Sequence, residues 1–463
     1  MMSTAVSPDE PAGPRQRVLW VSTIVFTMLF AVWLMLGVLG LEMKKDAVLM
    51  LGAEAAETLA PEAKKAAIES RFEWLLATAI LSGAIFRLTF GIWADKYGGR
   101  TMMVLLLLVS AVPTYLIGQA TSYAELLACA ALFGLAGNSF TVGIAWNSAW
   151  FPDRSKGTAL GVFGAGNVGA SGTKILVILV PSVLTLVPVA GYAGGWIPGG
   201  WRFVPTMYAA LLVLAAIATL VLTPKTDRKP GRGRTLTEML APLKYMRVWR
   251  FGLYYVVVFG AYVALSAWLP NYYKTNYFAD RPAQEAVQLA ALMTAAYIFP
   301  AGLLRPLGGW LSDLYGPRVV TYAVFIVMTL ATIPLCLPSS VLRLDVWSFT
   351  ALMFVVGVGM GIGKASVYKY VPNYFPNDVG AVGGLVGALG ALGGFFLPPM
   401  FGMLGRTTGS PQAAFYALLG LTVGSLVWLH VVVLRLKAAS RAAATGTTDA
   451  AANREPVGAL SGV

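Results

Sequence analysis

The chain has 463 residues, of which 57% are hydrophobic and only 12% are charged. A soluble globular protein carries about 25% charged residues, so the composition excludes an ordinary soluble protein and favours one that crosses a membrane repeatedly. The net charge of +13 could suit nucleic acid. The basic residues, however, lie in connectors between apolar runs, and no nucleic-acid partner is therefore expected.

Twelve apolar runs are long enough to span a membrane, since about 30 Å of hydrocarbon needs roughly 20 helical residues. The first, 18–42, is too long for a removable signal peptide and lacks a small-residue cleavage site, so we interpret it as a retained helix. The other runs of the first half are 73–94, 101–120, 125–150, 158–188 and 202–223. Those of the second half are 250–274, 287–311, 319–337, 347–371, 379–404 and 412–436. We predict an all-α membrane protein with twelve transmembrane helices.

The basic residues occupy every second connector and so mark one side of the membrane. They are densest after the sixth run, and the positive-inside rule places that connection and both termini in the cytoplasm. The loop at 43–72 carries both signs of charge and is predicted to lie outside. The predicted domains are a cytoplasmic N-terminus (1–17), a six-helix bundle (18–223), a basic cytoplasmic linker (224–249), a second six-helix bundle (250–437) and a disordered cytoplasmic tail (438–463).

Several kinds of active site are not supported by the available residues. Cys129 and Cys336 fall inside predicted spans and the single histidine, His430, lies near the end of the last one, so neither a disulfide framework nor a metal site is expected. No glycine-rich loop ending in Lys-Ser/Thr occurs, which argues against ATP as the energy source. We expect no cofactor. Catalysis of bond changes is not implied either, so an enzyme is not predicted.

Two stretches of the chain repeat earlier ones. The second span leads into FRLTFGIWADKYGGR (86–100), and the eighth into LRPLGGWLSDLYGPR (304–318). At one constant offset the matched pairs are Arg87 and Arg305, Gly91 and Gly309, Asp95 and Asp313, Tyr97 and Tyr315, Gly98 and Gly316, Arg100 and Arg318. A second echo pairs WFPDRSKGTALGVFGAGNVGASG with YFPNDVGAVGGLVGALGALGG. Six spans, a basic linker and six more spans indicate a parallel duplication.

The matched arginines, Arg87 and Arg305, lie inside the predicted membrane. Each precedes its aspartate, Asp95 or Asp313, by eight residues, which is about 12 Å along a helix. Each costs about 2.5–3.5 kcal/mol to insert at such a depth, and no Asp or Glu lies within the interior of the twelve spans. The arginines could snorkel or bond helix carbonyls. We favour a positively charged central cavity that receives an anion, because both arginines recur and their forks suit a planar oxyanion.

The loop after the second span resembles the signature of the major facilitator superfamily, G-x-x-x-D-x-x-G-x-R. The resemblance extends over roughly 18–436 and implies a major facilitator fold of two six-helix halves. It marks Gly91, Asp95 and Arg100, and in the second half Gly309, Asp313 and Arg318, as a gating motif. We expect Asp95 to meet a neighbouring helix N-terminus and Arg100 to hold a gate through ion pairs. A charged turn that only orients the hairpin is the alternative.

The fifth span contains the run GVFGAGNVGASGTK, whose glycines could serve close helix packing alone. The arrangement of Gly164, Gly166 and Asn167 also resembles the nitrate signature of the nitrate/nitrite porter family, often called NarK-type. That resemblance implies substrate contacts from the arginine clamps Arg87 and Arg305, the amide of Asn167, the hydroxyl of Tyr255 and the rings of Phe140 and Phe259. For the aromatic residues, simple helix packing remains an alternative.

The chain departs from the family pattern at several positions. The eleventh span has Ala391 where we align Asn167, and three lysines lie in predicted spans, at Lys174, Lys364 and Lys369. A lysine can bind a second anion or lose its proton when desolvated, so these are candidates for coupling transport to protons. Lys369 could instead lie near helix carbonyls at the cytoplasmic end.

The family resemblance implies a monomeric carrier of a small inorganic anion, nitrate or nitrite, surrounded by lipid of the cytoplasmic (inner) membrane. The anion would be held between the two arginines and moved by alternating access, either in nitrate/nitrite exchange or in nitrate/proton symport. Two other classes stay open. A facilitator for small organic anions would need a roomier site, and a non-transporting membrane sensor would need a signalling domain that the short linker does not provide.

Overall fold

The computed structural model describes residues 12–169, 188, 191–338 and 340–444. In this part of the chain the secondary structure is helical, with one isolated backbone pairing between Tyr192 and Ile197. Eleven of the described helices are long and apolar enough to cross a membrane. The predicted span at 158–188 begins as α10 (Asp153–Ala165) and η2 (Gly166–Val168), and most of its remainder lies outside the described residues.

The chain divides into two compact units, each built mainly from one of the predicted bundles. Unit 1 comprises Met1–Pro152, Val162–Val248 and Asn377–Leu392, and unit 2 comprises Asp153–Gly161, Trp249–Pro376 and Gly393–Val463. Each unit therefore includes the beginning of a helix whose remainder belongs to the other unit. These helices are α10 and α20 (Val379–Thr408).

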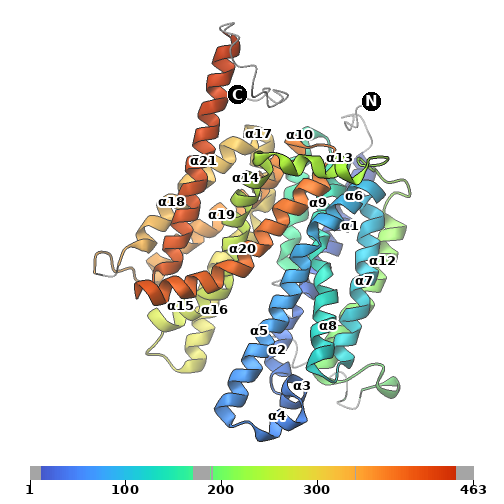
Figure 1. The fold of residues 1–463 in the computed structure, drawn as a ribbon, viewed down its shortest axis with the longest axis vertical. Coiled ribbons are helices and arrows are strands. Elements are labelled where there is room, and N and C mark those ends of the chain that lie inside the picture. The colour runs from blue at the N-terminus through green and yellow to red at the C-terminus, as the bar shows by residue number, and fades with distance from the viewer. Residues whose placement is uncertain (1–11, 170–187, 189–190, 339, 445–463) are drawn as a thin grey trace. The chain divides into compact units, whose positions relative to one another are not determined.

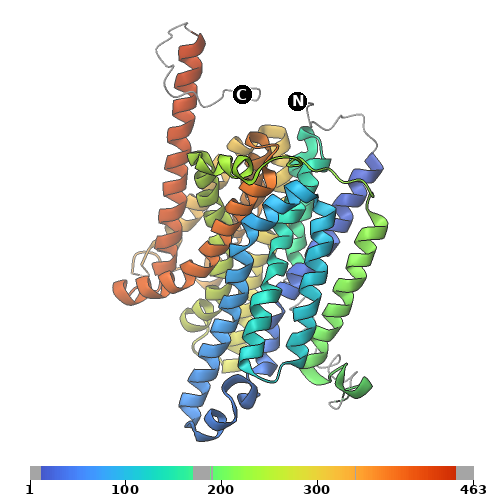
Figure 2. The ribbon, with the colours of Figure 1, turned by 45° about the vertical axis from the view of Figure 1, so that its right-hand side comes forward.

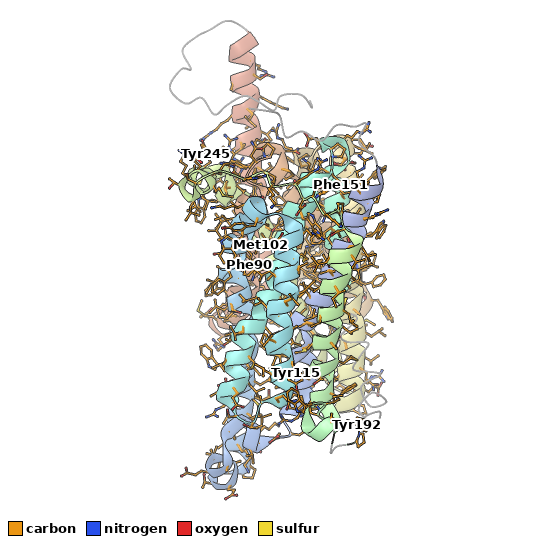
Figure 3. All side chains as sticks on the ribbon, turned by 90° about the vertical axis from the view of Figure 1, so that its right-hand side faces the viewer. Phe90, Met102, Tyr115, Phe151, Tyr192 and Tyr245 are labelled. Atoms are coloured by element: carbon orange, nitrogen blue, oxygen red, sulfur yellow. The ribbon has the colours of Figure 1, made fainter. Side chains whose placement is uncertain are left out.

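Unit 1 is a bundle in which α7 and α12 run side by side (Figures 1 and 2). Figure 3 shows Met102 and Tyr115 at different levels of α7, and the Tyr115 hydroxyl donates to the carbonyl of Trp196 over 2.9 Å. The elements of unit 1 are α1 (Ala12–Trp33), α2 (Met35–Met43), α3 (Ala47–Leu51), α4 (Ala53–Thr58), α5 (Pro61–Ile85), α6 (Arg87–Tyr97), α7 (Gly99–Gln119), α8 (Tyr123–Phe133), η1 (Gly134–Asn138), α9 (Ser139–Trp150), η2, η3 (Ala193–Gly195), η4 (Gly200–Arg202), α12 (Phe203–Leu222), α13 (Leu236–Leu240) and η5 (Ala241–Lys244).

Unit 2 is organised around α19, which packs against α16, α17 and α18. The last helix, α21, lies beside α18 (Figure 1). The elements of unit 2 are α14 (Met246–Tyr255, whose first residues belong to unit 1), the π-helical turn η6 (Val256–Gly260), α15 (Ala261–Asn276), α16 (Ala283–Leu303), α17 (Arg305–Tyr315), α18 (Pro317–Cys336), α19 (Val346–Tyr374) and α21 (Ala413–Ala444).

The two copies of the repeated motif fold alike. Gly98 separates α6 from α7 with φ 96°, and Gly316 separates α17 from α18 with φ 80°. Residues that carry a side chain rarely adopt backbone angles in this left-handed region, whereas glycine adopts them readily. The chain makes a tight turn between two helices at the same place in each half, and this turn explains the matched glycines.

Two predicted boundaries differ from the structure. Part of the predicted outer loop at 43–72 is helical, because α3, α4 and the first turns of α5 lie within it. The tail predicted to be disordered from residue 438 is helical through Ala444. The sequence KAASRAAA explains this, since alanine has the highest helix propensity and lysine and arginine rank close behind.

Candidate functional site

Arg87 is a buried cation at the first position of α6. The helix is interrupted at Phe86, where φ is −80° and ψ is −3°, and the arginine that follows is only 1% exposed. Its Nη1 donates to the carbonyl of Gly387 over 2.8 Å, and its Cζ lies 5.9 Å from the centre of a Trp33 ring. A helix carbonyl and an aromatic face therefore contribute to holding this charge inside unit 1.

Arg305 holds the equivalent place in unit 2. It begins α17 after an interruption at Leu304, where φ is −84° and ψ is 7°, and it is 2% exposed. Its Nη2 lies 3.1 Å from the Tyr255 hydroxyl, and its Cζ lies 5.9 Å from the Phe259 ring centre. The structure therefore brings together three of the predicted substrate contacts, Arg305, Tyr255 and Phe259.

The π-helical turn η6 explains how two of these contacts are presented. Tyr255 ends α14, Phe259 lies within η6, and their rings stack at 5.0 Å with 13° between their planes. Single π-helical turns inside α-helices are rare and frequently occur at functional sites. Close packing surrounds the turn, because a Cβ added to Gly393 would lie 3.0 Å from Val256 and 3.3 Å from the Cα of Gly260.

In unit 1 the predicted ring, Phe140, belongs to an aromatic cluster. Its centroid lies 5.5 Å from that of Phe26 and 6.0 Å from that of Phe163. Asn167 lies in η2 and is 7% exposed. Gly166 lets η2 approach α1, because a Cβ there would lie 2.6 Å from Phe26 and 2.9 Å from the Thr27 hydroxyl. Gly164 is also buried. Close packing is therefore a demonstrated use of Gly166.

The Asp95 carboxylate meets a helix N-terminus. It is 2% exposed and accepts the N–H of Gly380 at 3.0 and 2.8 Å and that of Ala381 at 3.2 Å, at the start of α20. The helix dipole favours a negative charge at this position. Gly91 lies against the same turn, since a Cβ on it would overlap the Gly380 carbonyl oxygen. A backbone approach this close requires glycine.

Asp313 makes the matching contact in unit 2 and adds an ion pair. It accepts from the backbone N–H of Gly157 at 2.8 Å and of Thr158 at 2.6 Å, at the start of α10. The Nζ of Lys369 lies 2.7 Å from the same carboxylate, and both side chains are buried. Gly309 approaches Gly157 as Gly91 approaches Gly380. Of these two carboxylates, only Asp313 has a lysine partner in the described part of the chain.

The paired glycines also correct one alignment. Gly157 meets Asp313 and Gly380 meets Asp95, so equivalent positions at the beginnings of α10 and α20 differ by 223 residues. At that offset Asn167 corresponds to Gly390. The alignment of Asn167 with Ala391 was wrong by one residue, because the connection before α20 is one residue shorter than the one before α10.

The motif arginines have partners other than the expected carboxylates. The Arg100 guanidinium donates to the Thr223 hydroxyl at 3.1 Å and to the Leu220 carbonyl at 2.7 Å, so the expected ion pair is replaced by contacts at the end of α12. A cation is favoured near a helix C-terminus, which gives the physical reason. Arg318 donates to the Tyr374 hydroxyl at 3.1 Å.

Sequence reasoning missed Asp227, a carboxylate in the basic linker that accepts four hydrogen bonds. The donors are the backbone N–H groups of Arg100 and Arg228, at 2.8 and 2.9 Å, and the indoles of Trp146 and Trp150, at 3.1 and 3.0 Å. The available signal was a single acid inside PKTDRKPGRGR. Asp227 therefore fastens the beginning of the linker to unit 1.

A second contact fastens the linker further along. The Arg234 guanidinium lies 2.6 Å from the Asp378 carboxylate. Burial raises the pKa of Asp378, and the neighbouring Arg234 opposes that shift. Beyond it, Met239 of α13 packs with Ile92 and Ala381 in an apolar cluster.

The three candidate lysines have different surroundings. Lys364 is 1% exposed, and its Nζ donates to the Ala301 carbonyl at 3.0 Å. Lys369 is paired with Asp313. Lys174 lies outside the described residues. Among the described residues there is no group of three or more His, Cys, Asp or Glu side chains that could hold a metal ion.

Known proteins are similar to this chain over almost its whole length. The sequence model of the Major Facilitator Superfamily matches residues 19–287 and 283–461. A probable nitrate/nitrite antiporter, NarK1, of Thermus thermophilus is 52% identical over 436 residues, which cover 91% of this chain and 92% of the relative. The nitrite extrusion protein of Bacillus subtilis is 30% identical over 366 residues, with 78% of this chain and 86% of the relative covered. The relatives are named as transporters rather than enzymes.

Solved structures confirm the predicted fold. The fucose:proton symporter FucP of E. coli matches with a TM-score of 0.65 at 14% identity, covering 89% of this chain and 98% of the other. The human organic anion transporter MFSD10 matches with a TM-score of 0.63 at 16% identity, covering 90% and 99%. At such low identity these likenesses concern the fold alone.

Proposed function

Because the chain belongs to the nitrate/nitrite porter family of the major facilitator superfamily, we propose that it transports nitrate, nitrite or both across the cytoplasmic membrane. The names of its relatives support this substrate class. The observation that carries the proposal is the repeated pair of buried arginines, Arg87 and Arg305, each at the first residue of its helix. An oxyanion is a suitable ligand for two buried guanidinium groups that recur at matched positions.

In this proposal the anion binds to groups supplied by both units. Arg87 and Arg305 each offer a planar fork that can give paired N–H bonds to an oxyanion. The other proposed substrate contacts are the polar groups of Asn167 and Tyr255 and the rings of Phe140 and Phe259. In the fifth span, Gly164 and Gly166 carry no side chain that would occupy space next to the anion. Nitrate carries one charge and is small and flat, whereas sulfate and phosphate add charge and bulk.

Transport then follows from alternating access. The bound anion neutralises the repulsion between the two arginines and lets the units rock, which exposes the site to alternate sides of the membrane. We call the contacts of Asp95 with α20 and of Asp313 with α10 latches, because each holds the beginning of a helix whose remainder belongs to the other unit, and Gly91 and Gly309 allow the close approach. Arg100 and Arg318 brace the same ends of their units. The positive-inside rule places these latches, the linker and both termini in the cytoplasm.

Exchange and proton symport remain alternative modes of this carrier. Exchange requires only that the carrier without a bound anion switches slowly between its outward-facing and inward-facing states, which the positive charges of the two arginines would cause. Symport requires a group that takes up and releases a proton, for which Lys174, Lys364 and Lys369 are the candidates. One relative is named an antiporter.

The full chain reconstituted in liposomes tests the proposal. We expect labelled nitrate to enter vesicles that contain nitrite faster than it enters protein-free vesicles, and formate or acetate to compete weakly. Equal competition by these carboxylates would instead favour a facilitator for organic anions. The absence of any nitrate or nitrite flux from correctly inserted protein would favour a sensor.

A further inference from the structure

Lys364 is a buried cation whose contacts in unit 2 are neutral. Its Nζ donates to the Ala301 carbonyl at 3.0 Å and lies 3.1 Å from the centre of the Tyr262 ring and 5.8 Å from that of the Phe259 ring. Within the described residues no carboxylate lies within ion-pair distance of this ammonium group. A carbonyl and aromatic faces stabilise a cation only in part, so the charge on Lys364 is incompletely compensated.

Lys369, five residues further along α19, has a different role. Its Nζ lies 2.7 Å from the Asp313 carboxylate and 2.6 Å from the Asp153 carbonyl. This lysine is therefore committed to the latch at the start of α10, and its positive charge is matched by a negative one. Of the two candidate lysines in the described chain, Lys369 has a carboxylate partner and Lys364 has none.

Lys364 lies beside the part of the proposed anion site that unit 2 provides. The Phe259 ring is approached by two cations, since its centre is 5.9 Å from the Arg305 Cζ and 5.8 Å from the Lys364 Nζ. The titratable and charged side chains that the elements packed around Lys364 present to this region are Tyr255 of α14, Tyr262 of α15, Tyr297 of α16 and Arg305 of α17, with Tyr368 on α19 itself. On α18, Arg318 binds Tyr374 near the far end of α19.

The internal repeat points to the same place. WFP at 150–152 and YFP at 374–376 end the fourth and tenth spans at an offset of 224. The same offset takes Phe140 to Lys364. In unit 2 the lysine therefore occupies the position that unit 1 gives to a proposed substrate-facing ring.

We propose that Lys364 is the proton-carrying residue that couples anion transport to protons. This rests on the proposed function. While the anion is bound, its negative charge lies beside Arg305 and Lys364 and stabilises the lysine as an ammonium ion. When the anion leaves, its stabilising negative charge is gone, and the repulsion between Arg305 and Lys364 favours the neutral form of the lysine. One N–H bond of Lys364 then breaks, the electron pair stays on nitrogen, and the proton leaves on the same side as the anion. Arginine cannot release its proton in this way, whereas a desolvated lysine can.

The return of the carrier completes the cycle. With Lys364 neutral, unit 2 carries one positive charge fewer, so the empty carrier reorients more easily than a carrier with both cations fixed. Binding of the next anion then draws a proton onto the amine. One proton accompanies each anion, and no electron is transferred.

Proteoliposomes test this with two fluxes measured on the same preparations. The first is nitrate uptake into anion-free vesicles under an inward proton gradient, and the second is nitrate uptake against trapped nitrite without a gradient. We expect wild type to perform both. Lys364→Gln and Lys364→Arg should lose gradient-driven uptake, because neither side chain exchanges a proton near neutral pH, whereas exchange should fall by a much smaller factor. Lys437→Gln makes the same change at an exposed lysine and should retain both fluxes.

The other outcomes separate the possible failures. Gradient-driven uptake that survives in Lys364→Arg would overturn the proposal. Loss of exchange in both Lys364 variants would make the residue a binding or structural group and would overturn it as well. Wild-type protein that exchanges nitrate but ignores the proton gradient would refute the coupling role and leave the proposed function intact. Wild-type protein with neither flux would refute the proposed function itself.

Discussion

Arg87 and Arg305 illustrate how a membrane protein can keep a charge at a depth where it costs several kcal/mol. Each arginine follows an interruption of its helix and lies near a ring, Trp33 or Phe259, and a hydrogen-bond acceptor. Phe86 and Leu304 adopt nearly the same backbone angles at the two interruptions. The duplication has therefore preserved the placement of the charge, and not only the residue type.

Substitution of Arg305 tests whether its planar fork matters. Arg305→Lys keeps the charge but turns a paired contact into a point contact, and loss of one charged hydrogen bond costs about 1.5–3 kcal/mol, or roughly ten- to hundredfold in affinity. Nitrate concentration dependence of exchange in proteoliposomes measures the change. Arg305→Ala should bind no nitrate and yet unfold no earlier than wild type without ligand, because a costly buried charge is gone. Normal affinity in either variant would contradict a substrate-binding role.

At the scale of elements, the approach of η2 to α1 depends on Gly166. A Cβ there would already lie 2.6 Å from the Phe26 ring and 2.9 Å from the Thr27 hydroxyl, and forced overpacking costs about 1–3 kcal/mol. We expect Gly166→Leu to lower the unfolding temperature in detergent and to reduce nitrate flux severely. Val168→Leu enlarges a neighbouring side chain that is 41% exposed, and it should be mild. Equal tolerance of the two changes would show that packing against α1 is not limiting.

The two latches are alike in backbone geometry and differ in charge, which leads to a second prediction at this scale. Asp313→Asn leaves Lys369 buried without its carboxylate, and breaking a buried pair in this way costs about 3–5 kcal/mol. Asp95→Asn, at a carboxylate held by backbone N–H groups, should cost less, because asparagine is nearly as good a helix cap.

A double-mutant cycle isolates the ion pair between Asp313 and Lys369. Asp313→Asn combined with Lys369→Gln should destabilise by less than the sum of the single changes, with a coupling energy of about 0.5–3 kcal/mol. Thermal unfolding of the purified proteins provides the measurement. Strict additivity would mean that the 2.7 Å contact contributes little to stability.

For the whole molecule, hydropathy and internal repetition predicted twelve membrane-spanning helices in two matched sets, and the resemblance of the loop motif implied the major facilitator fold. The local departures were not predictable in the same way. An apolar run does not reveal the interruption at Phe86 or the π-helical turn at Val256–Gly260, since both depend on packing between distant segments. For the same reason the motif marked Arg100 as a candidate but did not indicate that its partners lie at the end of α12.

The charges of the linker suggested only orientation, whereas its contacts show attachment. Asp227, Arg234 and Met239 bind it to unit 1 through a carboxylate with four donors, an ion pair and an apolar cluster. These contacts hold the linker against the rest of unit 1 from Asp227 to Met239.

Trypsin measures this attachment, because the linker contains several lysines and arginines between residues 225 and 234. Asp227→Ala removes the acceptor of four hydrogen bonds, and bonds to a charged group contribute about 1.5–3 kcal/mol each. We expect cleavage within 225–234 to become much faster while the rest of the protein stays resistant. Asp227→Asn, which keeps one acceptor oxygen, should give an intermediate rate, and Asp280→Ala, at an exposed acid in unit 2, should not alter it. Cleavage of Asp227→Ala at the wild-type rate would show that the other contacts suffice to fasten the linker, and that the carboxylate serves only to cap α7.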